Sequence, residues 1–316
     1  MLAGNMPGVD PKIAVVVVGA NVCSAWQWWL QSITPLPVLA PGDRFIFDQK
    51  RWGQALACLN HDDPEQTNNI AVLYLASQIL ADPCEILSIV QGQPIDVCVA
   101  DPSLDPQIRK ALENPATFPH ALSENMAFWT QLATIIKMGI FPEFIVTLPN
   151  TKSTDPGPDG LSLSFDGNRN AVVELRSVKS SINDPSGHIA TADFRRGLEP
   201  DPCIPPDAQL DEFYLVINDG YGFTKLERLL VSAFHGLHKT GSHALRVGLI
   251  RNQNRLNAML VADDQHARPD RFEIYSRIPR QPADKIATYI GADQWQIFAE
   301  SIRQVVINTL TTAGVL

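Results

Sequence analysis

Apolar and polar residues alternate in two short runs within residues 157–179 of this chain. The apolar positions of the two runs are Leu161, Leu163, Phe165, Val173 and Leu175. The sequence Asp-Gly-Asn at 166–168 separates the runs and favours a tight turn. A period of two on either side of such a turn predicts an antiparallel β-hairpin.

Three charged residues belong to this predicted hairpin. Asp159 lies at its open end, Glu174 lies in the middle of the second strand, and Arg176 follows two positions later. Residues two apart on a strand point to the same face, so Glu174 and Arg176 share a face and strand pairing can bring Asp159 close to them. The pattern therefore predicts a charged cluster on a sheet, and an ordinary structural ion pair is the alternative interpretation.

The first hundred residues show apolar runs that alternate with helical stretches, which predicts an α/β unit covered on both faces. The expected strands lie at residues 13–19, 44–47, 85–90 and 95–100, and the expected helices at 50–59 and 69–80. A connection rich in Pro and Asp follows at 101–122, with one short helix near 106–113. We place a domain boundary in this connection, which gives domains at 1–114 and 115–316.

The second part of the chain begins with Ser123, which we interpret as the N-cap of an amphipathic helix. Further strands are expected at 144–148, 210–217, 246–250 and 258–262, and helices at 224–237 and 294–310. The order in which these elements follow one another is helix, strand, hairpin, strand and helix.

The spacing of the charged residues resembles the signature of the PD-(D/E)XK nuclease superfamily. Pro158 and Asp159 are followed, after a gap of 14 residues, by Glu174-Leu175-Arg176. The resemblance implies that Asp159 and Glu174 bind a divalent cation, Mg²⁺ or Mn²⁺, and that a helix before the first core strand adds a third acid. Glu124 is the matching residue for that acid, and stabilisation of the helix dipole is its alternative role.

This chain departs from the family pattern at one position, because Arg176 stands where the family has Lys. Arginine keeps its proton near neutral pH and presents a wider set of donors than an ammonium group. Lys179 is an alternative for the lysine role if a bulge or the strand end turns it towards the acids. Catalysis by Asp159, Glu174 and either Arg176 or Lys179 is thus the interpretation that the resemblance supports.

The resemblance also implies a fold class and a function. The fold would be α/β, a restriction-endonuclease-like mixed sheet flanked by helices, with an additional N-terminal α/β domain. The function would be Mg²⁺-dependent hydrolysis of phosphodiester bonds of DNA, in the manner of cytoplasmic endonucleases of prokaryotic antiviral defence. The alternative is a catalytically retired subunit of that fold that binds nucleic acid or a partner protein, such as a helicase or a second copy, or a sensing or assembly module.

Charge is distributed unevenly along the chain. The net charge is −9 at pH 7, yet residues 225–280 contain ten basic and five acidic side chains. A local excess of positive charge suits contact with phosphates, although a solvated surface balanced by acids elsewhere would show the same count. Nucleic acid, with DNA as the expected form, is therefore the partner that we expect.

The cysteines, the apolar runs and the histidines argue against several kinds of site. The five cysteines are scattered without a C-x-x-C pair, which argues against a disulfide framework and a cysteine zinc site and favours a reducing cytoplasm. No apolar run approaches the ~20 residues of a transmembrane helix, so no membrane partner is expected. His235, His238 and His243 form the one histidine cluster, for which phosphate contact or plain surface is a better interpretation than zinc binding.

Overall fold

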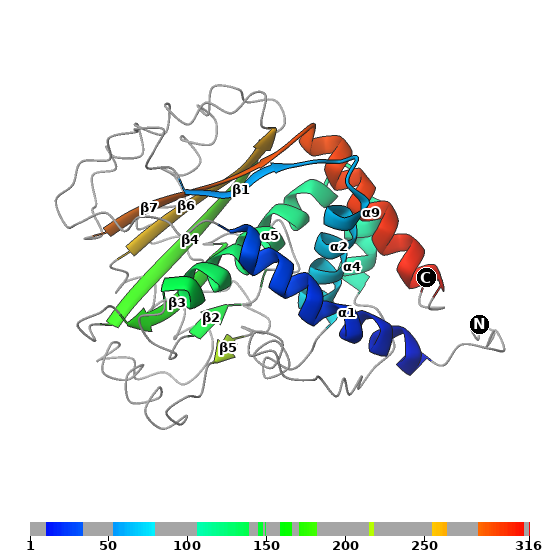
Figure 1. Ribbon diagram of the computed structural model, residues 1–316, viewed down its shortest axis with the longest axis horizontal. Coiled ribbons are helices and arrows are strands. Elements are labelled where there is room, and N and C mark those ends of the chain that lie inside the picture. Colours follow the sequence, from blue (N-terminus) through cyan, green and yellow to red (C-terminus); the bar gives the residue numbers. More distant parts are fainter. Residues whose placement is uncertain are drawn as a thin grey trace.

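The computed structural model describes residues 11–33, 53–79, 106–138, 145–147, 149, 159–165, 171–181, 215–217, 255–263, 284–312 and 316 of the chain. Five helices belong to these residues: α1 (Pro11–Ser32), α2 (Pro64–Ile79), α4 (Pro106–Glu113), α5 (Phe118–Met138) and α9 (Trp295–Thr312). The seven described strands are β1 (Gly53–Leu59), β2 (Ile145–Thr147), β3 (Gly160–Phe165), β4 (Ala171–Ser181), β5 (Leu215–Ile217), β6 (Arg255–Asp263) and β7 (Asp284–Ala292). Helices account for the larger share of the residues in these elements (Figure 1).

The described strands hydrogen-bond in the order β1-β7-β6-β4-β3-β2-β5. The pairs β1·β7, β7·β6 and β6·β4 are parallel, whereas β4·β3, β3·β2 and β2·β5 are antiparallel. The predicted hairpin is confirmed, since β3 and β4 pair in an unbroken register from Gly160 opposite Arg176 to Phe165 opposite Ala171. The change from parallel to antiparallel neighbours therefore occurs at β4, the strand that holds Glu174 and Arg176.

The fold class predicted from the sequence is wrong. Described residues 11–138 are helical apart from turns and the single strand β1, and β1 has its partner in β7 rather than in a sheet of an N-terminal unit. The valine run expected as a strand at 13–19 lies inside α1, and the helix expected at 50–59 overlaps strand β1. A restriction-endonuclease-like sheet accompanied by an N-terminal α/β domain is thus replaced by a chain whose first part is a group of helices.

Packing explains why α1 is helical despite its valines. Val22, Ala25, Trp26, Trp29 and Ile33 recur at helical spacing and are all buried. The indole rings of Trp26 and Trp129 lie 5.6 Å apart, so α1 packs on α5 through aromatic side chains. A strand would send alternate members of this set to opposite faces, so the helical form buries more apolar surface.

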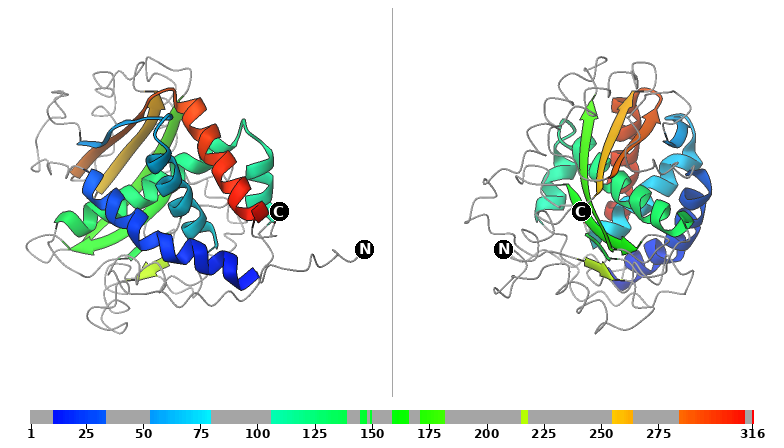
Figure 2. Two further views of the ribbon diagram at one scale, coloured as in Figure 1. Left: turned by 45° about the vertical axis from the view of Figure 1, so that its right-hand side comes forward. Right: turned by 90° about the vertical axis from the view of Figure 1, so that its left-hand side faces the viewer.

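The helices pack on one another as well as on the strands. Figure 2 shows α1, α2 and α9 lying beside one another, and all three contribute side chains to the same hydrophobic core. Trp129 of α5 donates its indole N–H to the carbonyl of Leu73 in α2 at 3.0 Å, which satisfies a polar group inside this core. Helix α5 therefore has a fixed position between the other helices and β4.

The structure also decides several smaller predictions. Ser123 is not an N-cap, because α5 begins at Phe118 and the Ser123 hydroxyl donates to the carbonyl of His120 within the helix. The strand expected at 258–262 is confirmed as part of β6, whereas β7 was not predicted. The elements expected at 44–47, 85–90, 95–100, 224–237 and 246–250 lie outside the described residues.

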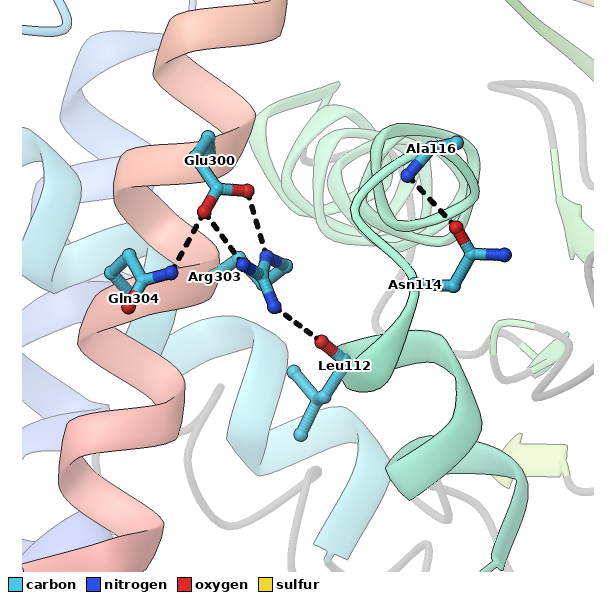
Figure 3. Close-up of polar contacts among 6 residues, drawn as sticks. All are labelled: Leu112, Asn114, Ala116, Glu300, Arg303 and Gln304. Atoms are coloured by element: carbon cyan, nitrogen blue, oxygen red, sulfur yellow. Dashed lines mark hydrogen bonds and ion pairs between the residues drawn. The ribbon is translucent and has the colours of Figure 1, made fainter.

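A polar contact ties α9 to the end of α4 (Figure 3). Arg303 donates to both carboxylate oxygens of Glu300 at 2.7 Å and to the carbonyl of Leu112 at 2.6 Å. The last carbonyls of a helix lack intrahelical donors, so the guanidinium of Arg303 completes the last turn of α4. Among the described helices, none combines the length and the apolar character needed to cross a membrane.

Candidate active site

The predicted charged cluster lies where β4 faces α5. Glu174, Arg176 and Val178 alternate along β4, and all three are buried. Ser162 lies directly opposite Glu174 on β3 and is also buried. The side chain of Gln131 reaches this face from α5. Strand alternation and the α5 contact together enclose a polar group within an otherwise apolar interior.

Arg176 is the centre of the cluster and is fully buried. Its two terminal nitrogens donate to Gln131 Oε1 at 2.6 Å and to the backbone carbonyl of Asp159 at 3.2 Å. The guanidinium also lies 6.0 Å from the ring centroid of Phe128, within the range of a cation–π contact. The two hydrogen bonds orient the guanidinium, whose Nε atom has no hydrogen-bond partner among the described residues.

Burial lowers the pKa of Arg176 to about 10, because a charged group is disfavoured away from water. The negative charges of Asp159, Glu174 and Glu124 act in the opposite direction and favour the charged form. Arg176 therefore remains a cation at neutral pH. A proton-accepting role for this side chain is excluded, as its chemistry had suggested from the sequence.

Asp159 is held by the strand that follows the hairpin turn. Its Oδ2 atom accepts the backbone N–H of Val178 at 2.5 Å, while its carbonyl accepts from Arg176. A carboxylate that accepts a backbone N–H is both oriented and stabilised in its ionised form. The sequence prediction that hairpin pairing brings Asp159 to Arg176 is confirmed.

Glu174 is buried, with 6% of its surface exposed. Its Oε1 atom accepts a hydrogen bond from Gln131 Nε2 at 2.8 Å. The prediction that Glu174 and Arg176 share one face of the strand is confirmed by their common contact with Gln131. The neutral amide thus lies between a carboxylate and a guanidinium.

Glu124 lies on α5, seven residues before Gln131. Seven residues are close to two helical turns, which places both side chains along one side of the helix. Glu124 is 8% exposed, and its charge acts on Arg176 of β4. Burial, together with the charge of Glu124, raises the pKa of Tyr74 in α2. The charge of Glu124 thus acts both on Tyr74 of α2 and on Arg176 of β4.

Lys179 belongs to β4 and pairs with Leu260 of β6. The β4–β6 register is unbroken from Glu174 to Ser181, so the described backbone has no bulge that would bring Lys179 into phase with Glu174 and Arg176. Its side chain lies outside the described residues.

Mg²⁺ and Mn²⁺ prefer carboxylate oxygens, and Asp159 and Glu174 supply this donor type within one buried cluster. In the part of the chain that the structure describes, no three side chains of His, Cys, Asp or Glu are arranged to hold an ion on their own. Mg²⁺ is commonly bound through one or two carboxylates, with waters and substrate phosphates completing its shell. The donor type suits such an ion. Asp159 bonds to Val178 N–H, however, and Glu174 lies four residues before Val178 on β4, so the two carboxylates would have to approach each other to share one ion.

Sequence reasoning missed three residues of the cluster: Gln131, Ser162 and Gly160. Gln131 is a polar residue on the buried side of an apolar helix, at a two-turn spacing from Glu124, and this spacing was a usable signal. Ser162 is opposite Glu174 in the hairpin register. Gly160 is opposite Arg176, and a Cβ at Gly160 would overlap the guanidinium.

The basic stretch 225–280 contributes only residues 255–263 to the described structure. His235, His238 and His243 lie outside it.

Comparison of the chain with protein-family models, with curated proteins and with solved structures found no match.

Proposed function

We propose that this chain is a metal-dependent nuclease that hydrolyses phosphodiester bonds of DNA, with Asp159 and Glu174 as ligands of Mg²⁺ or Mn²⁺. The observation that carries the proposal is that carboxylates from three places, the residue before β3, β4 and α5, act electrostatically on Arg176, the one fully buried cation among the described residues. Groups with perturbed protonation gather at functional sites more often than elsewhere. The resemblance of Asp159, Glu174 and Arg176 to a nuclease motif supplies the reaction class.

Each residue of the cluster has its own role in the proposed reaction. A bound divalent ion would activate water and polarise a phosphate oxygen. Asp159 and Glu174 would bind and orient that ion, since both are fixed by hydrogen bonds from the protein. Arg176 has no exposed surface, so its role is to balance the charge of the acids inside the protein rather than to contact DNA.

Full burial of Arg176 also favours a second candidate function. A retired nuclease subunit, which binds nucleic acid or a partner protein without cutting, would keep the charged cluster for stability alone. In that case the Gln131 contact with Glu174 would close the site permanently. Defence against phages is the biological setting that we propose for either function, with a helicase or a second copy of the chain as the proposed partner.

The experiment uses the purified full chain, a labelled linear DNA and Mn²⁺ titration by calorimetry. Asp159→Asn and Glu174→Gln keep the shape of each side chain but remove its charge, and we expect both to abolish cleavage and to weaken Mn²⁺ binding. Glu300→Gln is the matched control, because Glu300 is a carboxylate of α9 paired with Arg303. We expect this control to cut DNA at the rate of the unmodified chain.

The outcomes separate the two functions. Cleavage that persists in a chelator, or at full rate in both Asp159→Asn and Glu174→Gln, would refute the nuclease proposal. DNA binding without cleavage at any Mn²⁺ concentration would support the retired subunit.

A further inference from the structure

Gln131 of α5 bonds to both strands of the β3–β4 hairpin. Its Nε2 atom donates to Glu174 Oε1 at 2.8 Å and to Ser162 Oγ at 2.9 Å, and its Oε1 atom accepts from Arg176 at 2.6 Å. The side chain is almost fully buried, with 1% of its surface exposed. One amide therefore joins a central helix to β3 through a hydroxyl and to β4 through a carboxylate and a guanidinium.

Helix α5 is buried along most of its length. All residues from 122 to 134 are buried, a stretch of more than three turns at 3.6 residues per turn. The buried apolar side chains of this stretch are spread over several sides of the helix: Leu122, Met126, Ala127, Phe128, Trp129, Leu132 and Ala133. The packing of this surface sets the rotation of α5, but hydrophobic attraction has no direction, so a helix turned by one residue would still bury apolar side chains. Apolar contacts alone therefore discriminate weakly between neighbouring settings of the helix.

The hydrogen bonds of Gln131 do have a direction. An ionised carboxylate only accepts hydrogen bonds, and a guanidinium only donates them. The amide nitrogen must therefore face Glu174, and the amide oxygen must face Arg176. A turn of α5 by one residue, about 100°, would carry the amide away and leave both charged groups buried without these bonds. Such a setting is disfavoured, because a buried charge that loses a partner costs more than a shift of apolar contacts.

A second directional bond holds the opposite side of α5. Trp129 donates its indole N–H to the carbonyl of Leu73 in α2 at 3.0 Å. Trp129 and Gln131 are two residues apart, or about 200° around the helix axis, so their side chains leave α5 on opposite sides. Helix α5 is therefore bonded to α2 on one side and to the hairpin on the other.

We propose that Gln131, Glu174 and Arg176 form a polar clasp that restricts α5 to one setting on the hairpin, so that the cluster provides a unique packing rather than additional stability. Desolvation of a carboxylate and a guanidinium offsets much of what their contacts contribute, and a buried polar group can hold its neighbours in one register at a cost in stability. Gly160 on β3 provides space for the clasp, since a Cβ at this position would overlap the guanidinium. The inference does not depend on the proposed function, because it involves neither metal nor DNA.

The test replaces the whole clasp by apolar side chains in the full chain, as Gln131→Leu/Glu174→Leu/Arg176→Met. Replacement of all three avoids a buried charge that has lost its partner. The matched control is Thr130→Val/Thr134→Val, since both threonines are buried in α5 and, among the described contacts, their hydroxyls bond only to carbonyls of that helix. Far-UV circular dichroism measures secondary structure, near-UV circular dichroism measures the packing of the buried tryptophans, and urea unfolding measures stability.

We expect the triple variant to keep the far-UV spectrum of the unmodified chain. Its urea midpoint should be no lower than that of Gln131→Leu alone, in which Glu174 and Arg176 lose their common partner. We also expect it to lose most of its near-UV signal and to bind the dye ANS, because helices without fixed packing keep their secondary structure and expose apolar surface. The control should keep the near-UV spectrum of the unmodified chain.

Three results would overturn the inference. A triple variant with an unchanged near-UV spectrum would show that the packing is unique without the clasp. A urea midpoint below that of Gln131→Leu would show that the cluster adds stability. An equal loss of near-UV signal in the control would show that any buried hydroxyl of α5 has the same effect.

A second variant decides if the triple variant does not fold. Gln131→Asn keeps the amide but is one methylene too short to reach both Glu174 and Arg176. We expect amide hydrogen exchange of α5 to be faster in this variant than in Thr130→Val/Thr134→Val. Exchange of α5 at the rate of the unmodified chain would overturn the inference.

Discussion

Replacement of Gly160 by alanine tests whether the buried guanidinium of Arg176 lies directly over this glycine. Gly160 begins β3 and pairs with Arg176 of β4. Its backbone φ lies outside the left-handed region, so glycine is required by space and not by backbone conformation. An alanine Cβ would overlap the terminal atoms of the Arg176 guanidinium. Either the guanidinium or the strand must move.

The expected loss of folding stability in Gly160→Ala follows from the contacts that Arg176 would lose. Forcing an extra methyl group into a packed interior costs about 1–3 kcal/mol. Displacement of the guanidinium from the Asp159 carbonyl removes a hydrogen bond to a charged group, which contributes about 1.5–3 kcal/mol. The reduced freedom of alanine in the unfolded chain returns about 0.4–1 kcal/mol. The net expectation is a loss of about 2–5 kcal/mol, a large fraction of the ~5–15 kcal/mol that stabilises a typical protein.

The assay is urea unfolding followed by tryptophan fluorescence, since Trp26, Trp29, Trp129 and Trp295 are buried. A double-mutant cycle adds Arg176→Met, which removes the guanidinium. That single change should cost about 3–5 kcal/mol, because it leaves buried carboxylates without their cation. In the Arg176→Met background, Gly160→Ala should have almost no further cost. The coupling energy should therefore be well above the ~0.5 kcal/mol found for independent sites.

An additive cycle would refute the reasoning. If Gly160→Ala costs the same in both backgrounds, its effect arises from the strand and not from Arg176. A Gly160→Ala variant as stable as the unmodified chain would show that the guanidinium does not lie over this glycine.

Three further predictions concern other parts of the chain. Arg303 donates hydrogen bonds to the Glu300 carboxylate and thereby lowers the pKa of Glu300 from its ordinary value of 4.5. The contact therefore stabilises the fold above pH 4.5, and this stabilisation is lost as the pH falls further. In urea titrations, the stability difference between the unmodified chain and Glu300→Gln should shrink over that pH range. Its size at pH 7 should stay below ~1 kcal/mol because Glu300 is partly exposed. Asp63→Ala should lower the free energy of unfolding by about 0.5–2 kcal/mol, because Asp63 Oδ1 accepts the backbone N–H groups of Glu65 and Gln66 at the start of α2. The control Asp62→Ala should lower it far less, because the neighbouring Asp62 is mostly exposed. Arg176→Lys should keep the charge but lose the fork that joins Gln131 to the Asp159 carbonyl, so both its stability and its DNA cleavage should lie between those of the unmodified chain and Arg176→Ala.

Local pattern was sufficient for the hairpin and for the face shared by its charges. Alternation with a period of two and a turn between the runs determine β3 and β4, and the same period places Glu174 and Arg176 together. These features depend on neighbours along the chain, so the sequence contains their physical cause. The approach of Asp159 to Arg176 follows from the same register.

The valine run in α1 shows where local pattern fails. Four consecutive β-branched residues favour a strand by propensity, and the sequence alone gave that expectation. The helical form is determined further along the chain, where Val22, Trp26 and Trp29 align on one buried side of α1 and Trp26 packs against Trp129 of α5. Helix propensity differences amount to a few tenths of a kcal/mol per residue, whereas burial of a large side chain contributes about 1.5–3 kcal/mol, so tertiary packing prevails.

The composition of the charged cluster was also beyond the sequence. The motif spacing identified Asp159, Glu174 and Arg176, but the burial of Arg176 depends on α5, which lies far away in the chain. Gln131 and Ser162 enter the cluster through the packing of α5 on β4 and the pairing of β3 with β4. No local rule fixes the rotation of a helix about its axis against a sheet. That rotation is set by the whole apolar surface buried between them, and it is what places a neutral amide between a carboxylate and a guanidinium.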